Sequence, residues 1–147
     1  MKHYSSVFLR LALGVSFLSA VADRLGLWGS FGQPNVSWGD FLHFVAYTGK
    51  LNSFMPSAAI PALAWVATCA ETLLGVALVL GVFTRVAAFL SGWLLLLFAL
   101  SMTFALGIKT PLNLSVFSAS GAAFLLATCR KYPWSLDSLR SQPGRNP

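Results

Sequence analysis

The stretch VAAFLSGWLLLLFALSMTFAL, residues 86–106, decides the fold class of this chain. It contains no charged side chain, and a helix of this length rises about 30 Å, which is the thickness of the hydrocarbon core of a bilayer. A helix also bonds all of its backbone N–H and C=O groups within the segment, as a chain in lipid must do. Residues 86–106 are therefore predicted to form a membrane-spanning helix.

The composition of the whole chain supports the same environment. Of the 147 residues, 56% are hydrophobic and only 10% are charged, whereas a soluble domain carries roughly 25% charged residues. So few polar groups cannot cover a water-soluble globule, which argues against a soluble enzyme. The net charge of +6 is typical of the topology signals of a membrane protein, and no nucleic-acid partner is predicted.

Four apolar segments are predicted to cross the membrane, and they form one domain, residues 1–131, followed by a cytoplasmic tail, residues 132–147. The predicted spans are 7–25, 58–82, 86–106 and 112–129, with the loop 26–57 outside. An alternative for the first span is a cleaved signal peptide, because Lys2 precedes an apolar core and residues 20–22 have a small-x-small pattern. Arg10 fits that alternative poorly, so the segment is expected to be retained.

The basic residues predict the orientation. On the side of the two termini lie Lys2, Arg10, Arg85, Arg130, Lys131, Arg140 and Arg145, and on the other side lie Arg24, Lys50 and Lys109. The positive-inside rule then places both termini in the cytoplasm. Short second and third turns make neighbouring helices antiparallel, so the predicted fold is an all-α integral membrane four-helix bundle. The expected anchors at the cytoplasmic interface are Arg85, Arg130, Lys131 and Trp134.

The outer loop is predicted to contain a short amphipathic helix. Ser37 and Asp40 resemble a capping box at its start, and Gly49 is a stop signal. Its apolar face repeats at helical spacing in Trp38, Phe41, Leu42 and Val45. The opposite stripe contains His43 and Tyr47, which either face solvent or belong to a lid that turns them toward a cavity.

Small residues predict which faces of the spans meet, because close backbone approach drives helix association in lipid. These faces are Ala64, Ala67, Glu71, Gly75 and Leu78 on the second span, Ala88, Gly92, Ala99 and Thr103 on the third, and Ser115, Ser118, Ala119 and Ala122 on the fourth. Glu71, near the middle of its span, is thereby expected inside the bundle.

A buried carboxylate needs compensation, and Arg10 is the preferred partner of Glu71. The axial offset between them is about 11 Å, so a direct pair requires an extended Arg10 or a displaced helix, and a hydrated link is the alternative. Arg24 and Lys109 are interpreted as interfacial anchors, or as members of an outer polar cluster with Asp23, His43 and Tyr47. On a helical wheel, Ser16, Ser19 and Asp23 share a face that lies opposite Arg10, Gly14 and Phe17.

Two motifs carry a resemblance to a known family. FLRLALG at residues 8–14 and ETLLGVALVLGVFTR at residues 71–85 resemble the DoxX family of small four-helix membrane proteins. The matching polar residues are Arg10, Glu71, Thr84 and Arg85. The resemblance implies a bacterial inner membrane and a role in oxidoreductase or thiol-stress assemblies, among them a thiosulfate:quinone oxidoreductase. The loop with Trp28, Trp38 and His43 departs from the general pattern of the family.

Three classes of function follow. The first is a membrane subunit or scaffold of an oxidoreductase assembly, with a quinone bound at Glu71 and Arg10, or alternatively at the outer groups Asp23, His43 and Tyr47. Because the sequence holds no haem ligand pair, flavin motif or cysteine pair, the electrons would come from a partner protein or from a soluble donor. The second class is a non-catalytic assembly protein, and the third is a transporter of protons or small solutes, for which a homo-oligomer would supply a shared cavity.

Overall fold

The computed structural model describes residues 3–140, and within them all the regular secondary structure is helical, without strands. The elements in chain order are α1 His3–Arg24, α2 Phe41–Leu51, the short 3₁₀ helix η1 Ser57–Ala59, α3 Ile60–Leu80, α4 Thr84–Leu106, α5 Lys109–Asn113, α6 Val116–Ala127 and α7 Leu136–Arg140.

Three helical segments are long and apolar enough to cross a membrane: Tyr4–Arg24, Ser57–Leu80 and Thr84–Leu106. They correspond to the first three predicted spans. The fourth predicted span, 112–129, is not one continuous helix, because α5 ends at Asn113 and α6 begins at Val116. Between them Ser115 has a left-handed backbone with φ of 55°. Asn and Ser side chains compete with helical hydrogen bonds, which makes this an understandable place for a break.

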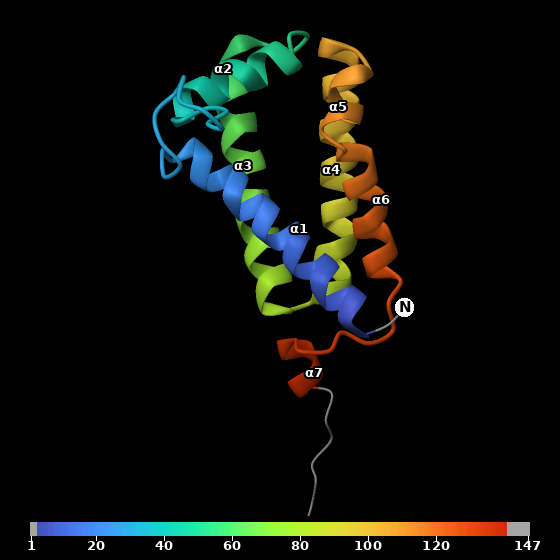
Figure 1. The fold of residues 1–147 in the computed structure, drawn as a ribbon. Coiled ribbons are helices and arrows are strands. Elements are labelled where there is room, and N and C mark those ends of the chain that lie inside the picture. The colour runs from blue at the N-terminus through green and yellow to red at the C-terminus, as the bar shows by residue number, and fades with distance from the viewer. Residues whose placement is uncertain (1–2, 141–147) are drawn as a thin grey trace, which may run out of the picture.

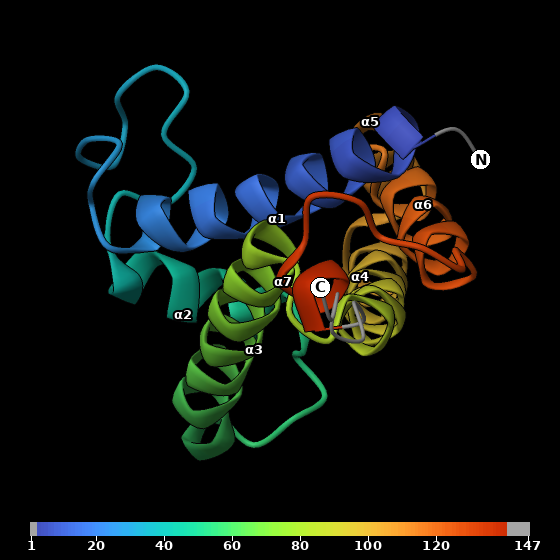
Figure 2. The same cartoon turned by 90° about the horizontal axis from the view of Figure 1, so that it is seen from below.

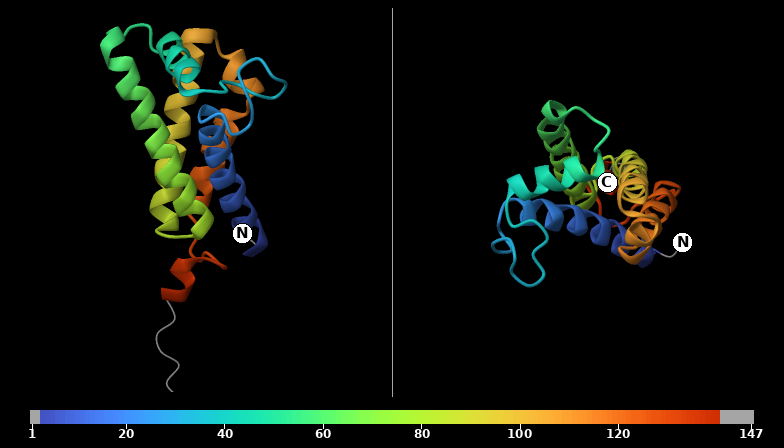
Figure 3. Two further views of the ribbon diagram at one scale, coloured as in Figure 1. Left: turned by 90° about the vertical axis from the view of Figure 1, so that its left-hand side faces the viewer. Right: turned by 90° about the horizontal axis from the view of Figure 1, so that it is seen from above.

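The helices associate mainly as two pairs, α1 with α3 and α4 with α6 (Figure 1). Helix α1 runs diagonally across α3, so that its two ends lie near different helices (Figures 1 and 2). At one end of the molecule α2 lies across α3 and α4, and at the other end α7 lies below the turn between those two helices (Figures 1 and 3).

The close contact of α1 with α3 depends on two glycines. A Cβ added to Gly14 would lie 2.9 Å from the carbonyl oxygen of Gly75 and 2.8 Å from Cγ2 of Val79. A Cβ at Gly75 would lie 3.1 Å from the carbonyl oxygen of Gly14. The backbones therefore approach too closely for any side chain at this crossing, as is common where helices pack in lipid.

The predicted packing faces are right on α3, right for most of α4 and only partly right on α6, where Ala119 packs against the core. The buried residues of α3 include all five of the predicted face, Ala64, Ala67, Glu71, Gly75 and Leu78. On α4, Ala88, Gly92 and Ala99 are buried and Thr103 is partly exposed. On α6 the buried residues are Ser120, Ala123, Leu126 and Ala127, whereas Ser115 and Ser118 are exposed. The buried face of α6 is rotated relative to the predicted one because Ser120 faces α4. Its hydroxyl donates to the Gly92 carbonyl of α4 at 2.8 Å.

The boundaries predicted for α2 are also corrected. Its N-cap is Asp40, which accepts the His43 N–H at 2.9 Å, and the helix continues past Gly49 to Leu51. The helix starts late because Gly39 turns the chain with φ of +68°, in close contact with the Phe31 backbone. Its buried side is consequently formed by Phe44 and Thr48, with Phe41 and Val45 packed nearby, and Leu42 is 79% exposed.

The segment that was predicted to be a separate tail docks on the fold through residue 140. The Asp137 carboxylate accepts the backbone N–H groups of Phe83 and Thr84, at 2.9 and 2.8 Å, and also the Thr84 hydroxyl. The Asp137 N–H in turn donates to the Gly81 carbonyl at 3.0 Å. Asp137 thus caps the start of α4 from more than fifty positions away in sequence.

The glycine crossing predicts a position-specific effect of side-chain size. Gly14→Leu is expected to reduce the free energy of unfolding by at least about 2 kcal/mol, because a side chain there must push α1 away from α3. The matched control is Gly121→Leu on α6, where no atom lies within 4 Å of an added Cβ. Thermal unfolding in detergent, followed by circular dichroism, measures both. Equal midpoints for the two variants would contradict the close crossing.

Candidate functional site

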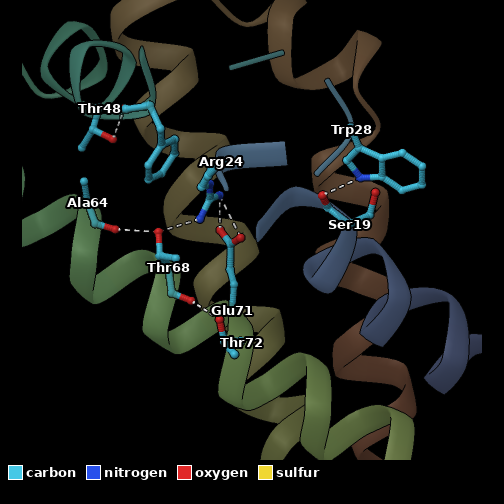
Figure 4. A network of polar contacts seen from close by, with 9 residues as sticks. Ser19, Arg24, Trp28, Thr48, Ala64, Thr68, Glu71 and Thr72 are labelled. Atoms are coloured by element: carbon cyan, nitrogen blue, oxygen red, sulfur yellow. Dashed lines mark hydrogen bonds and ion pairs between the residues drawn. The ribbon is translucent and has the colours of Figure 1, made fainter. Parts of the chain in front are cut away.

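A buried ion pair connects α1 with α3 (Figure 4). Arg24 is the last residue of α1, and its Nη2 lies 2.8 Å from Oε2 of Glu71 and donates to Oε1 at 2.9 Å. The side chains of Arg24 and Glu71 are only 3% and 2% exposed. The prediction that Glu71 lies inside the fold is therefore confirmed.

Thr68 fixes the second nitrogen of the same guanidinium. It lies three residues before Glu71 on α3, so the two side chains share a helix face. Arg24 Nη1 donates to Thr68 Oγ1 at 3.0 Å, and the Thr68 hydroxyl donates to the Ala64 carbonyl at 2.9 Å. The two α3 side chains thus bond both terminal nitrogens of the guanidinium and fix its position.

Aromatic side chains of the first loop and α2 close the site from the other side. The guanidinium carbon of Arg24 lies 3.7 Å from the ring centroid of Phe44 and 5.1 Å from that of Trp38. An aromatic face attracts a cation, and the attraction grows when both are removed from water. Phe44 is itself buried against Ala64 and Ala67 of α3. Helix α2 is thus a cover over the ion pair, in place of the solvent that would otherwise surround it.

The expected pairing of Glu71 with Arg10 is wrong. Helix α1 runs diagonally across α3 (Figure 1), and its last residue, Arg24, is the one that pairs with Glu71. Arg10 lies instead near the α7 end, where its Nη2 donates to the Trp134 carbonyl at 2.7 Å. Arg24, which was interpreted as an interfacial anchor, is the actual partner of Glu71.

The outer polar cluster predicted from Asp23, Arg24, His43, Tyr47 and Lys109 does not form. Asp23 Oδ2 accepts the N–H groups of Ser37 and Trp38, at 2.9 and 3.1 Å, and Lys109 is exposed at the start of α5. Asp23 and Arg24 are adjacent on α1 but point to different neighbours. Asp23 bonds to the first loop, and Arg24 bonds to Glu71 on α3.

His43 and Tyr47 have different surroundings on α2. His43 is exposed, lies 2.7 Å from Asp40 Oδ2 and stacks on Phe31 with ring centroids 3.8 Å apart. The bonds that His43 donates to Asp40 lower the pKa of that carboxyl. Tyr47 is partly buried near Trp38, and burial raises the pKa of its hydroxyl. The solvated interpretation therefore holds for His43.

The predicted anchors gather at the α7 end. Arg85, Arg130, Lys131 and Trp134 are all exposed there. Arg85 Nε also donates to the Ala127 carbonyl of α6 at 3.2 Å. Thr84, one of the polar residues in the motif at residues 71–85, is fully buried beside Asp137.

The ion pair has hydrogen-bonding capacity that the protein does not use. Arg24 Nε is buried and has no hydrogen-bond partner among the described residues, and Glu71 Oε2 has only its ion pair with Arg24. A ligand at this site could therefore accept one hydrogen bond from the guanidinium of Arg24 and donate one to the carboxylate of Glu71. Within residues 3–140, no three His, Cys, Asp or Glu side chains are grouped as metal ligands would be.

A double-mutant cycle tests the ion pair. Glu71→Gln and Arg24→Gln are each expected to lower the free energy of unfolding by about 3 kcal/mol, because each leaves one buried charge without its partner. The double variant should recover much of this loss, since two amides can bond to each other and neither is charged. Unfolding of the purified variants in mild detergent provides the four free energies. Additive losses would contradict a direct pair.

Asp40→Asn is the matched control for the cycle. It also removes a carboxylate next to α2, but Asp40 is exposed and Asn caps a helix as well as Asp. Its unfolding midpoint should stay near that of the unaltered protein.

Comparison with known proteins adds one finding to this geometry. The sequence profile of the DoxX family matches residues 5–106, which is more than half of the chain and includes Arg10, Arg24, Glu71, Thr84 and Arg85. Neither the comparison with curated proteins nor that with solved structures produced a significant match. The three long apolar helices agree with the family of membrane proteins that the profile describes. The match over residues 5–106 identifies the chain as a member of the DoxX family.

Proposed function

We propose that this protein is a subunit of an oxidoreductase assembly in the bacterial cytoplasmic membrane and that it binds the head group of a quinone-type lipid at Arg24 and Glu71. The observation that carries the proposal is the ion pair, whose two side chains are 3% and 2% exposed. Ionisable side chains within membrane segments are costly and typically mark a binding or proton-transfer site.

In this proposal the chain crosses the membrane four times, with both termini in the cytoplasm. Helices α5 and α6 together form the fourth crossing, with the break at Ser115 between them. The exposed basic residues at the α7 end, Arg85, Arg130 and Lys131, support a cytoplasmic location of that end. Helix α2 then lies at the outer face of the membrane.

The unused hydrogen-bonding capacity matches a quinone head group. A quinone carbonyl accepts a hydrogen bond, which the unpartnered Arg24 Nε can donate. The hydroxyl of the reduced form donates to a carboxylate, and Glu71 provides one. The surrounding helix faces are apolar, as the ring and tail of such a lipid require. The redox group that exchanges electrons with the quinone belongs to the partner protein.

Access to the pair depends on α2. The Phe44 ring lies directly against the guanidinium, so a head group reaches Arg24 only when this ring moves aside. The proposed binding step is therefore a displacement of α2 from α3 that uncovers the guanidinium and lets the head group reach the Nε–H of Arg24, which donates in the guanidinium plane. Such a cover excludes water from the charged pair before and after binding.

Quinone binding can be measured on the full chain in lipid nanodiscs. Short-tailed ubiquinone and menaquinone are added separately, and bound quinone is determined after gel filtration by extraction and absorbance. We expect the unaltered protein to retain one of them and the double variant Arg24→Gln, Glu71→Gln to bind at least about tenfold more weakly, because the amides lack the charge-assisted bonds.

The control for this measurement is again Asp40→Asn, which should bind as the unaltered protein does. If the folded double variant binds both quinones as well as the unaltered protein, the site is not at the ion pair. If the unaltered protein retains neither quinone but purifies with a stoichiometric partner protein, the quinone part of the proposal is wrong and a scaffold role is favoured.

A further inference from the structure

A groove separate from the ion pair lies between the outer half of α1 and the first loop. Its volume is about 600 Å³. It is lined on α1 by Val15, Ser16, Ser19, Ala20 and Asp23 and on the loop by Trp28, Asn35, Ser37 and Trp38. The Trp28 indole N–H donates to the Ser19 carbonyl at 3.1 Å, which holds the loop against the helix (Figure 4). The groove is therefore bordered by the polar face of α1 on one side and by two tryptophans of the loop on the other.

Asp23 is the single charged residue in this lining, and its bonding is incomplete. The side chain is 6% exposed, and Oδ2 accepts two backbone N–H groups. Oδ1 is buried and has no hydrogen-bond partner among the described residues. A buried acceptor without a partner is costly, and a ligand that donates a hydrogen bond removes the cost. The positive charge of Arg24 is already neutralised by Glu71 on another side of α1.

The chemistry of the lining favours a cation. A carboxylate oxygen attracts a positive donor, and the faces of tryptophan rings bind ammonium groups. Among the described residues no cationic side chain lines the groove, so a cationic ligand meets no repulsion from its lining. A quaternary ammonium has no N–H to donate to Asp23 Oδ1, whereas a primary ammonium has three. The groove thus fits a primary ammonium better than a choline.

An apolar stripe along α1 leads into the groove and indicates a lipid rather than a free amine. Phe8, Leu11 and Val15 lie at helical spacing on one face and are 75%, 38% and 56% exposed. The stripe covers about 10 Å of the helix, from the middle of the predicted span 7–25 at Val15 to its cytoplasmic start at Phe8. Acyl chains on this stripe would place a lipid head group at Ser16, Ser19 and Asp23.

We propose that this groove binds one phospholipid with a primary ammonium head group, that the ammonium donates to Asp23 Oδ1, and that the acyl chains lie along the stripe. The site differs from the ion pair in its charged residue and its ligand, and the two share Trp38 as a neighbour. Because Asp23 Oδ1 is buried, the ammonium reaches it only when the loop side chains that border the groove shift.

Native mass spectrometry of the full chain tests this lipid site. The delipidated protein in detergent is mixed with equal amounts of phosphatidylethanolamine, phosphatidylcholine and phosphatidylglycerol, and each complex is counted. We expect the first lipid to bind with about tenfold preference and Asp23→Asn to abolish that preference, since Asn still accepts the loop N–H groups but carries no charge. Asp40→Asn, which removes an exposed carboxylate, should keep the preference.

A second variant separates loss of binding from loss of folding. Ser16 is exposed in the groove, so Ser16→Leu should fill the space without disturbing the core and should also abolish the preference. Equal binding of the ethanolamine and choline lipids by the unaltered protein would overturn the ammonium assignment. Displacement of the bound lipid by an equal concentration of soluble phosphoethanolamine would overturn the role of the acyl chains.

Discussion

The ion pair between Arg24 and Glu71 is the constraint on which the arrangement of the first half of the chain depends. A carboxylate in the middle of an apolar helix has to reach a cation, and within residues 3–140 the cation in contact with it is Arg24 at the end of α1. That requirement agrees with the diagonal course of α1 across α3 (Figure 1). The crossing in turn requires two residues without side chains, which Gly14 and Gly75 supply. Charge compensation and glycine packing are therefore two parts of one geometry.

The same pair explains why the outer loop folds back over the helices. The guanidinium of Arg24 has hydrogen-bond acceptors on its α3 side and needs a non-aqueous neighbour on the other, which Phe44 provides. Asp40 starts α2 at the position that turns Phe44 and Thr48 inward. At the opposite end, Asp137 performs a comparable task for the N–H groups at the start of α4. Each end of the fold is thus closed by a segment outside the long helices.

The sequence predicts those features that depend on one helix at a time. The spans follow from length and hydropathy, and the burial of Glu71 follows from the small residues that share its face, because both are local periodicities. The partner of Glu71 was not predicted, since it depends on the angle between two helices. Thr68, three residues before Glu71, was a usable signal for the site. The break at Ser115, the docking of Asp137 and the rotated face of α6 depend on contacts distant in sequence.

Asp23 and Arg24 connect the two proposed sites physically. They are adjacent, but Arg24 reaches α3 while Asp23 holds the loop through the N–H groups of Ser37 and Trp38. Trp38 belongs to both environments, because its backbone N–H is bonded to Asp23 in the groove lining and its ring lies 5.1 Å from the Arg24 guanidinium. A displacement of the loop that moves Trp38 therefore alters the groove and the cover of the ion pair together. Any energetic coupling between the two sites must act equally in both directions, since the binding free energies of two linked sites are reciprocal.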